Sequence, residues 1–234
     1  MSKPFSLVSG LDYATIMPSV MNFAGLGLLA LSGRENSGKH NWLKYSIEML
    51  NACYPGKSKV YLLDGVEKKL APLKNESNVY VYSGLPTDAI SYMKEIEMEL
   101  KKRYDAIVSG DEDVLEKSEL LIMILDNSDA LQAISSDSAA VAAYKNIVGK
   151  YKNMNVCILA VVDNSPISYS SPELLKTIRD QRHVLFFDDL SSLKLFDMPL
   201  PVVRNFKKAI EVGDCFYIKE TGCVKIKTPL NPKS

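Results

Sequence analysis

A short apolar run, a glycine-containing loop and an amphipathic segment follow one another near the start of the chain. Leu28 to Leu31 have the character of a parallel strand that is buried on both faces. The next stretch, SGRENSGKH from Ser32 to His40, holds two glycines, and residues 41–53 carry apolar side chains at helical spacing, with Trp42 expected in the core. Glycines allow a backbone to curl until its N–H groups converge on one anion, and the following helix adds its positive end. The unit therefore predicts a phosphate-binding loop between a strand and a helix.

Strand and helix patterns alternate along the rest of the chain. We expect strands at residues 60–63, 79–82, 120–126, 156–163 and 183–187, helices at residues 87–108, 130–151 and 172–180, and a hairpin over residues 214–227. Thr87 or Ser83 is the candidate cap of the first of these helices, and Thr221-Gly222 is the candidate turn of the hairpin. Helices between strands imply parallel β-α units. The predicted fold is a three-layer α/β sandwich with a mostly parallel central sheet, a C-terminal β-hairpin and the glycine loop at the carboxyl edge.

One domain accounts for most of the chain. Its expected boundaries are residues 25–228, after a lead segment of residues 1–24 and before a tail of residues 229–234. The 234 residues, 47% of them hydrophobic, suffice for one substantial core. Apolar residues 13–31 are interrupted by Pro18 and Gly25 and lack a basic lead, so they indicate neither a signal peptide nor a membrane span. Any membrane anchor of the native protein is expected outside this chain.

Composition limits the partners and the redox state. Lys and Arg total 28, as do Asp and Glu, so the overall charge favours neither nucleic acid nor an anionic membrane surface. The 4 cysteines form no C-x-x-C pair and indicate reduced thiols in the cytosol. A hairpin over residues 214–227 would place Cys215 nearer Lys227 than Cys223, which argues against a bridge between these two cysteines.

The glycine loop fits the G-x-x-x-x-G-K frame of phosphate-binding loops. The candidate nucleotide-binding residues are Gly33, Arg34, Glu35, Asn36, Ser37, Gly38, Lys39 and His40. Asn36 stands where such loops often carry another glycine. Because asparagine tolerates positive φ better than most residues, we expect the curl of the loop to survive.

Two positions depart from the pattern of an active ATPase. His40 stands where a serine or threonine hydroxyl would bind magnesium; imidazole suits softer metals, so we expect His40 to begin the helix and face its neighbours. In motor ATPases a second strand ends in an aspartate that helps hold the metal, followed by a glutamate that activates water. Asp126 keeps the aspartate, as the candidate metal residue, but Asn127 replaces the glutamate, and an amide is no base near neutral pH. We expect weak or absent hydrolysis: ATP remains a candidate ligand, and the lost hydroxyl argues against Mg²⁺.

Five other side chains have two interpretations each. Glu35, Asp129 and Asp163 could supply a substitute carboxylate, but solvated loop acids or helix caps explain them more simply. Arg179 and Arg182 could reach a neighbouring subunit's phosphate as arginine fingers, but surface arginines with local salt bridges are the simpler interpretation.

Four stretches occur in the order seen in FtsK/SpoIIIE-type ATPases. They are the loop SGRENSGKH, EMELKKRYDAI at residues 97–107, LLIMILDN at residues 120–127 and GDCFYI at residues 213–218. The chain resembles that family over nearly its whole length. Within the family it is most similar to the last, degenerate ATPase domain of the membrane-anchored coupling proteins of type VII (b) secretion systems.

This resemblance implies a cytoplasmic domain of a cell-membrane protein, the last of several RecA-like domains in one chain, working in a hexamer. The implied partners are WXG-type secreted substrates and the other ATPase domains of the same chain, with no nucleic acid expected. The family's Walker A positions are matched by Gly33, Gly38 and Lys39, and its Walker B aspartate by Asp126. His40 and Asn127 do not match, and Asp163-Asn164 stand where DNA-translocating relatives keep a polar sensor and Arg-Pro.

Three functions are compatible with these residues. The leading hypothesis is a module that recognises secreted proteins or neighbouring domains, with degenerate Walker motifs and weak or no ATP turnover. The alternative is an active protein-translocation ATPase completed in a hexamer, with Lys39 and Asp126 holding the nucleotide and Arg179 or Arg182 acting in trans. DNA translocation ranks behind both, because the balanced charge provides no electrostatic footprint for nucleic acid.

Overall fold

The computed structural model describes residues 4–206, 210–220 and 222–231. The strands in these residues are β1 (Ser6–Asp12), β2 (Pro18–Asn22), β3 (Gly27–Gly33), β4 (Ser58–Leu63), β5 (Val79–Ser83), β6 (Leu120–Leu125), β7 (Val156–Val161), β8 (Val184–Phe187), β9 (Asp214–Lys219) and β10 (Gly222–Lys227). The α-helices are α1 (Lys39–Cys53), α2 (Asp88–Val108), α3 (Val114–Lys117), α4 (Ser128–Ser136), α5 (Ser138–Val148), α6 (Glu173–Gln181) and α7 (Leu200–Asn205), with short 3-10 turns η1 (Phe23–Gly25), η2 (Ala71–Asn75) and η3 (Leu190–Ser192).

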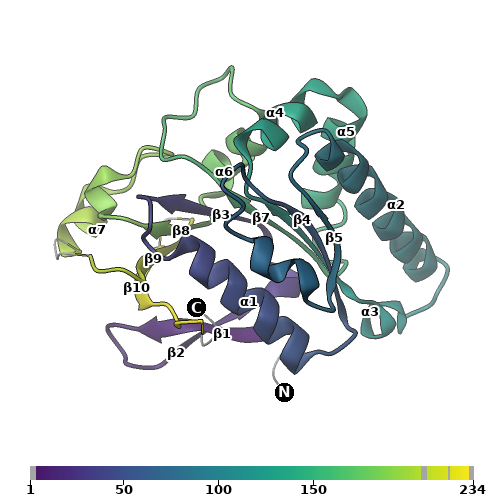
Figure 1. The fold of residues 1–234 in the computed structure, drawn as a ribbon, viewed down its shortest axis with the longest axis horizontal. Helices are drawn as coiled ribbons and strands as arrows, with labels where there is room; N and C mark the ends of the chain where they lie inside the picture. The colour runs from purple at the N-terminus through teal and green to yellow at the C-terminus, as the bar shows by residue number, and fades with distance from the viewer. Residues whose placement is uncertain (1–3, 207–209, 221, 232–234) are drawn as a thin grey trace.

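All the strands join one sheet, in the order β2-β1-β10-β9-β8-β3-β7-β6-β4-β5 (Figure 1). From β5 to β8 every neighbouring pair is parallel, and from β8 to β2 every pair is antiparallel. The parallel strands β3, β6 and β7 are apolar and buried because helices cover both of their faces. The predicted α/β fold, mostly parallel sheet and C-terminal hairpin are thus confirmed.

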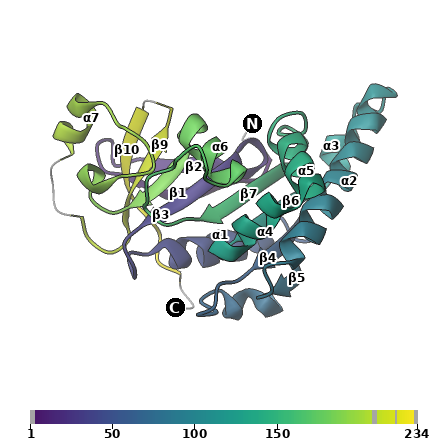
Figure 2. The same ribbon diagram turned by 90° about the horizontal axis from the view of Figure 1, so that it is seen from above.

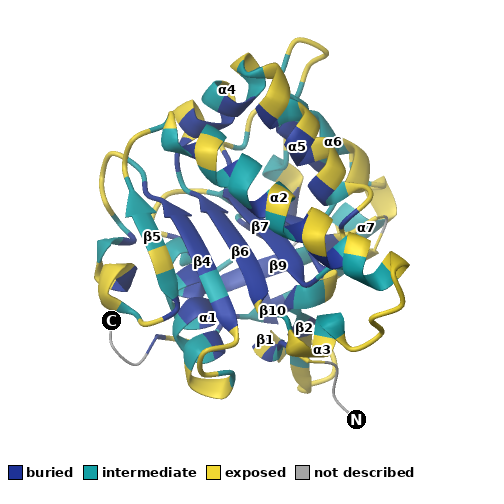
Figure 3. Ribbon diagram, turned by 90° about the vertical axis from the view of Figure 1, so that its right-hand side faces the viewer, coloured by how far each residue is buried: buried dark blue, intermediate teal, exposed yellow. Residues whose placement is uncertain are grey.

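Helices cover the parallel part of the sheet on both faces (Figures 1 and 2). On one face α1 buries Trp42, Leu43, Ile47 and Leu50 against β3, β4, β6 and β7. On the other face α2, α4, α5 and α6 cover the same strands, and the long helix α2 lies across them (Figure 3). Each fully buried side chain of this size contributes about 1.5–3 kcal/mol. These two cores hold the carboxyl ends of the parallel strands in one row.

One predicted helix was wrong in extent. Residues 130–151 do not form one helix, because the chain breaks at Asp137 between α4 and α5. The Asp137 carboxylate accepts a hydrogen bond from Ala140 N at 2.7 Å and caps α5, while Lys94 of α2 contacts the same carboxylate at 3.1 Å. Of the two candidate caps of α2, Thr87 directly precedes the helix, but its side chain makes no capping hydrogen bond. Ser83 Oγ instead donates to Asp88 Oδ2, in the first turn of the helix, at 2.6 Å.

The segment before residue 25 contributes β1 and β2 to the sheet, which the sequence did not indicate. Strand β1 pairs with β10 through Leu11 and Lys227. Trp42 is fully buried, as expected; its Nε1 donates to Ser9 O at 3.2 Å, and its ring stacks on Phe23 with centroids 6.1 Å apart. The lead segment is therefore bound both to the sheet edge and to α1.

Residues at the other end of the chain also pack against α1. Asn41 Nδ2 donates to Pro229 O at 2.8 Å, and Asn41 Oδ1 accepts from Asn231 N at 3.0 Å. None of the helices among the described residues combines the length and the hydropathy that a bilayer crossing requires.

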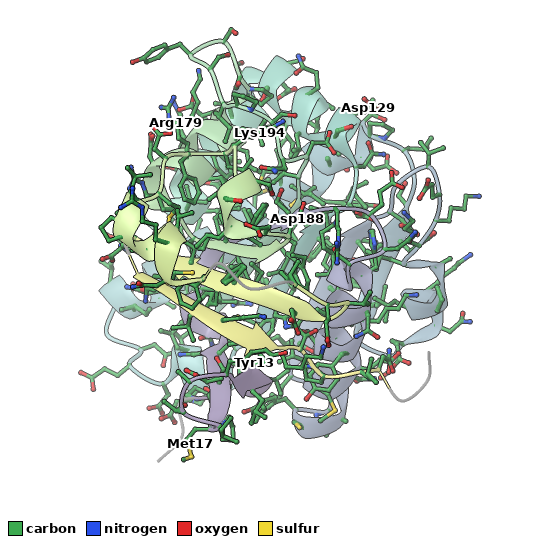
Figure 4. The ribbon with its side chains drawn as sticks, turned by 90° about the vertical axis from the view of Figure 1, so that its left-hand side faces the viewer. Tyr13, Met17, Asp129, Arg179, Asp188 and Lys194 are labelled. Atoms are coloured by element: carbon green, nitrogen blue, oxygen red, sulfur yellow. The ribbon has the colours of Figure 1, made fainter. Side chains whose placement is uncertain are left out.

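The hairpin β9–β10 is pinned by a buried carboxylate. Asp214 accepts from Tyr13 Oη at 2.7 Å and from Lys227 Nζ at 2.9 Å, and it pairs with Lys225 Nζ at 2.9 Å. Burial alone would raise the pKa of Asp214, but these hydrogen bonds outweigh it and hold the pKa well below its usual range. Figure 4 shows Tyr13 beside the hairpin. Asp214, the first residue of β9, thereby links Tyr13 of the lead segment to the hairpin.

The cysteines of the hairpin are separate, as expected. Cys215 pairs in register with Ile226, next to Lys227, whereas Cys223 pairs with Ile218. Both are free thiols. Of the predicted turn, Gly222 begins β10, and Thr221 lies outside the described residues.

The motif EMELKKRYDAI has a structural explanation in Arg103. Its guanidinium is 4% exposed and Nη1 donates to Glu119 O and Met154 O, both at 2.9 Å. Those carbonyls lie just before β6 and β7, so one side chain of α2 joins the amino ends of two core strands. Burial lowers the pKa of Arg103, and Glu99 at 3.4 Å opposes that shift.

Replacing Arg103 should therefore cost stability. In Arg103→Ala the carbonyls of Glu119 and Met154 lose their buried donor, and we expect the free energy of unfolding to fall by about 3 kcal/mol. Urea unfolding measures the change. Lys102→Ala is the matched control: that neighbour is 78% exposed, and its loss should change stability by less than about 0.5 kcal/mol. Equal effects of the two substitutions would contradict the assigned role.

His183 gives the fold a defined sensitivity to acid. Burial, with Lys219 nearby, lowers the pKa of His183 from 6.5 to about 4, and its Nε2 lies 2.9 Å from Tyr217 Oη. Between these values the unfolded chain binds a proton that the folded chain excludes. The contribution of His183 is thus complete above pH 6.5, is lost as the pH falls toward 4, and amounts to about 3 kcal/mol.

Urea unfolding at stepped pH, compared between wild type and His183→Gln, isolates this effect. Glutamine keeps a polar group near the position of Nε2 but does not titrate. The wild type should lose more stability than the variant between pH 6.5 and 4. Parallel pH profiles would show that folding leaves the pKa of His183 unshifted.

Candidate functional site

The glycine loop joins the end of β3 to the start of α1 at the carboxyl edge of the sheet. Gly33 has φ +128°, and a Cβ there would lie 2.6 Å from the Phe187 carbonyl carbon. Gly38 has φ +111°, directly before α1. Asn36 has φ 52°, so the prediction that asparagine supports the curl at positive φ is confirmed. Three residues of the loop thus have the positive φ that its curl requires.

Lys39 lies in the mouth of this loop. It is 8% exposed, and its Nζ donates to Gly33 O at 2.8 Å and to Arg34 O at 2.5 Å. Burial lowers the pKa of Lys39, and the nearby positive charge of Lys69 adds to the effect. A desolvated lysine held only by carbonyl oxygens favours an anion in front of it.

His40 lies in the first turn of α1 and contacts the residue that follows β6. Its Nε2 lies 3.0 Å from Asp126 Oδ1 and 2.9 Å from Asp126 Oδ2. Because an ionised carboxylate only accepts hydrogen bonds, Nε2 carries the hydrogen and donates to both oxygens. The expectation that His40 begins the helix and faces a neighbour is met, and that neighbour is the candidate metal residue itself.

This contact decides whether the residues fit Mg²⁺. Magnesium needs oxygen ligands at about 2.0–2.1 Å and retains several waters, so a loop hydroxyl and the aspartate must leave a gap between them. Here imidazole fills that gap and uses both oxygens of Asp126. No group of three or more His, Cys, Asp or Glu side chains among the described residues is arranged to hold a metal. The residues do not fit the usual magnesium site.

Asn127, at the position of the catalytic base, caps α4. Its Oδ1 accepts from Asp129 N at 2.9 Å and from Ala130 N at 3.4 Å, and the side chain is buried. The oxygen is thus directed into the helix terminus. This amide orders the start of α4 and is not available to polarise a water.

Of the candidate substitute carboxylates, Glu35 belongs to the loop itself, and Asp163 is near enough to influence Lys39. Glu35, Asp129 and Asp163 are all exposed, and Asp129 lies in the first turn of α4. The neighbouring Asn164 is structural: its Nδ2 donates to Ser192 O and its Oδ1 accepts from Lys194 N, both at 2.8 Å.

The two candidate arginines lie at the amino ends of the parallel strands, opposite the carboxyl edge that carries the loop. Arg179 is near the end of α6 and Arg182 follows it, just before β8 begins, whereas the loop follows the carboxyl end of the parallel strand β3. Arg179 Nε contacts Asp180 at 2.9 Å, and the Arg182 guanidinium lies 5.7 Å from the Phe196 ring centroid. Figure 4 shows Arg179 and Asp129 on opposite sides of the molecule. Within one chain, neither arginine reaches the loop.

A cleft of about 450 Å³ opens over the loop, and much of its wall was not foreseen. Besides residues 36–40 it is lined by Asn41, Lys44, Lys69, Val212, Gly213 and Leu230. Gly213 N donates to Ser37 O at 3.0 Å, so the turn before β9 rests on the loop. These residues come from four separate segments. Of the lining residues outside residues 36–40, only Gly213 belongs to a motif that the sequence analysis had noted, GDCFYI.

Asp64, after β4, is a second residue that the sequence analysis missed. It is fully buried and accepts from Gly65 N at 2.9 Å, Leu70 N at 3.2 Å and Tyr82 Oη at 2.8 Å. It therefore orders the loop that carries Lys69 to the cleft. The signal was present, since LLD at the end of β4 repeats the ILD at the end of β6.

A second, smaller cleft of about 320 Å³ has Asp126 in its wall. Its lining combines Asp126, Asn127 and Asp163 with apolar side chains, among them Leu131, Val162, Ile167, Leu175 and Leu195. The carboxyl edge thus carries two clefts, the basic cleft over the loop with its lysines and a second cleft of mixed polar and apolar lining, and the Asp126 end of β6 lies between them.

The layers, strand order and loop define a RecA-like P-loop NTPase sandwich. No protein-family model and no curated protein matches the sequence. Among solved structures, the cytoplasmic domain of EssC superimposes with a TM-score of 0.73 at 20% identity, over 98% of this chain and 43% of that one. EssC (ATPases 2 and 3) from Geobacillus thermodenitrificans gives 0.76 at 20% identity, over 97% and 41%.

A third structure extends the likeness to another secretion ATPase. Thermomonospora curvata EccC (ATPases 2 and 3), in complex with a signal sequence peptide, gives a TM-score of 0.70 at 12% identity, over 97% of this chain and 41% of that one. This chain spans less than half the length of these three structures. It has the fold of the EssC and EccC ATPase domains, which confirms the resemblance at the level of the fold.

The capping role of Asn127 can be tested directly. Asn127→Ala removes the acceptor for two backbone N–H groups of α4 and should lower the free energy of unfolding by about 1 kcal/mol. Ser128→Ala, at the exposed next position, is the control and should have little effect. Denaturant unfolding measures both, and an unchanged midpoint for Asn127→Ala would show that the amide does not stabilise the helix.

Proposed function

We propose that this chain is the terminal ATPase-type domain of a membrane-anchored type VII secretion coupling protein. It works in the cytoplasm, where it recognises secreted substrates or neighbouring ATPase domains and hydrolyses ATP slowly or not at all. The observation that carries the proposal is the His40–Asp126 contact, found in a chain with the fold of the EssC and EccC ATPase domains.

Two features support recognition without rapid chemistry. The hydroxyl that would hold magnesium is replaced by an imidazole bound to Asp126, and the base is replaced by the helix cap Asn127. Losing a general base alone removes about 10²- to 10⁴-fold of rate. The loop backbone and Lys39, which only bind, keep the geometry of a phosphate cradle.

The proposed partners follow from the neighbours of this fold. The EccC structure holds a signal sequence peptide, and the EssC and EccC structures contain more than one ATPase domain. We therefore propose WXG-type secreted proteins and sister ATPase domains as partners, and a hexamer in the full-length protein. ATP is the proposed ligand of the basic cleft, whose three lysines Lys39, Lys44 and Lys69 suit a polyphosphate.

A steady-state phosphate-release assay on the purified domain tests this function. We expect turnover far below ~1 per second, the slow end of ordinary enzymes, with or without a secreted peptide. Lys39→Ala should lower any residual rate further, because this lysine is a proposed binding residue of the loop. Turnover at an ordinary enzymatic rate, abolished by Lys39→Ala, would overturn the proposal.

The intact Gly33, Gly38, Lys39 and Asp126 favour one alternative, an active translocation ATPase completed by its neighbours. Arg179 or Arg182 would then act on a neighbouring subunit's nucleotide. The full-length protein distinguishes the two, because Lys39→Ala would abolish secretion if hydrolysis here drives transport and would leave it largely intact if recognition is the role.

A further inference from the structure

The His40–Asp126 contact has a consequence for ligand binding as well as for catalysis. In an ordinary phosphate loop the metal neutralises the outer phosphates and is itself held by the aspartate. Here the aspartate's negative charge already faces an N–H donor at 2.9 Å, inside the protein. Asp126 therefore needs no external cation.

The contact is well supported from both sides. The side chain of Asp126 is 9% exposed. Its backbone carbonyl oxygen lies only 2.6 Å from the position that a Cβ on Gly65 would take. His40 is fixed by the first turn of α1, whose next residue, Asn41, is bonded to the chain's C-terminal segment. The backbone is therefore held in place on both sides of the contact.

The remaining charges around the loop favour an anion. Lys39 lies in the mouth of the loop, Lys44 is one turn further along α1, and Lys69 reaches the cleft from the loop after β4, where it pairs with Glu67. The acids near the loop are Glu35, Glu67, Asp126 and Asp163; Asp126 is satisfied by His40, Glu67 pairs with Lys69, and Glu35 and Asp163 are exposed. The protein's own cations thus face the position of the phosphates.

We propose that this loop binds a nucleoside triphosphate without Mg²⁺, because the His40–Asp126 pair fills the metal's place. This inference concerns the ligand of the site that the proposed function treats as non-hydrolysing. Magnesium, which in solution complexes the triphosphate, gains nothing from this site. The free triphosphate binds as tightly as its magnesium complex, or more tightly.

Isothermal titration with ATP, in excess MgCl₂ and in excess EDTA, tests the proposal on the purified chain. In the wild type the dissociation constants in the two buffers should agree within about threefold, or favour EDTA. In His40→Thr, which restores the hydroxyl and frees Asp126, Mg²⁺ should tighten binding at least about tenfold. Adding Asp126→Asn to that variant should remove the gain.

Two controls keep the result interpretable. Lys39→Ala should weaken binding in both buffers, whereas Lys57→Ala, an exposed lysine before β4 at the opposite edge of the sheet, should change neither. If His40→Thr does not fold, judged by circular dichroism, His40→Ser replaces it, and the wild-type comparison stands by itself.

Two outcomes would overturn the inference. One is tightening of wild-type binding by Mg²⁺ of about tenfold or more. The other is no binding of ATP in either buffer. Neither would touch the proposed recognition role, which depends on slow hydrolysis and on binding of secreted proteins, so the two proposals fail separately.

Discussion

The packing of α1 against the centre of the sheet is the constraint on which the carboxyl edge depends. Its buried face, led by Trp42, fixes the direction of the helix, and the start of the helix fixes the loop. From that start come Lys39, aimed into the loop, and His40, aimed at the end of β6. The same helix holds β1 through Trp42 and the C-terminal segment through Asn41. The position of one helix therefore sets the glycine loop and the two side chains, Lys39 and His40, that leave its first turn.

Polar residues at this edge now stabilise structure in places where an active ATPase would use them for chemistry. His40 satisfies Asp126, Asn127 caps α4, and Asn164 joins the end of β7 to the turn η3. Each group uses its hydrogen-bonding capacity within the protein. A binding site whose charges are balanced internally can hold a ligand, but it lacks the free groups that a reaction needs.

The sequence predicted the core of this fold well because parallel buried strands and a curled glycine loop leave strong local patterns. The positive φ of Asn36 and the burial of Trp42 followed from residue type alone. The break at Asp137 was missed because an alanine-rich stretch outweighed one capping residue. The His40–Asp126 contact joins residues 86 positions apart, and no spacing rule connects them. The walls of the cleft, Lys69 and Val212, depend on loop placement in the same way.

The pairing of β1 with β10 has a practical meaning for anyone who divides this chain. A fragment cut at residue 25 would uncover the end of β10 where Ile226 and Lys227 pair with β1, and would strip Phe23 from the indole of Trp42. An open strand edge beside newly exposed aromatic surface is a template for intermolecular pairing. Such a fragment would aggregate, and its insolubility would say nothing about the nucleotide site that it was made to study.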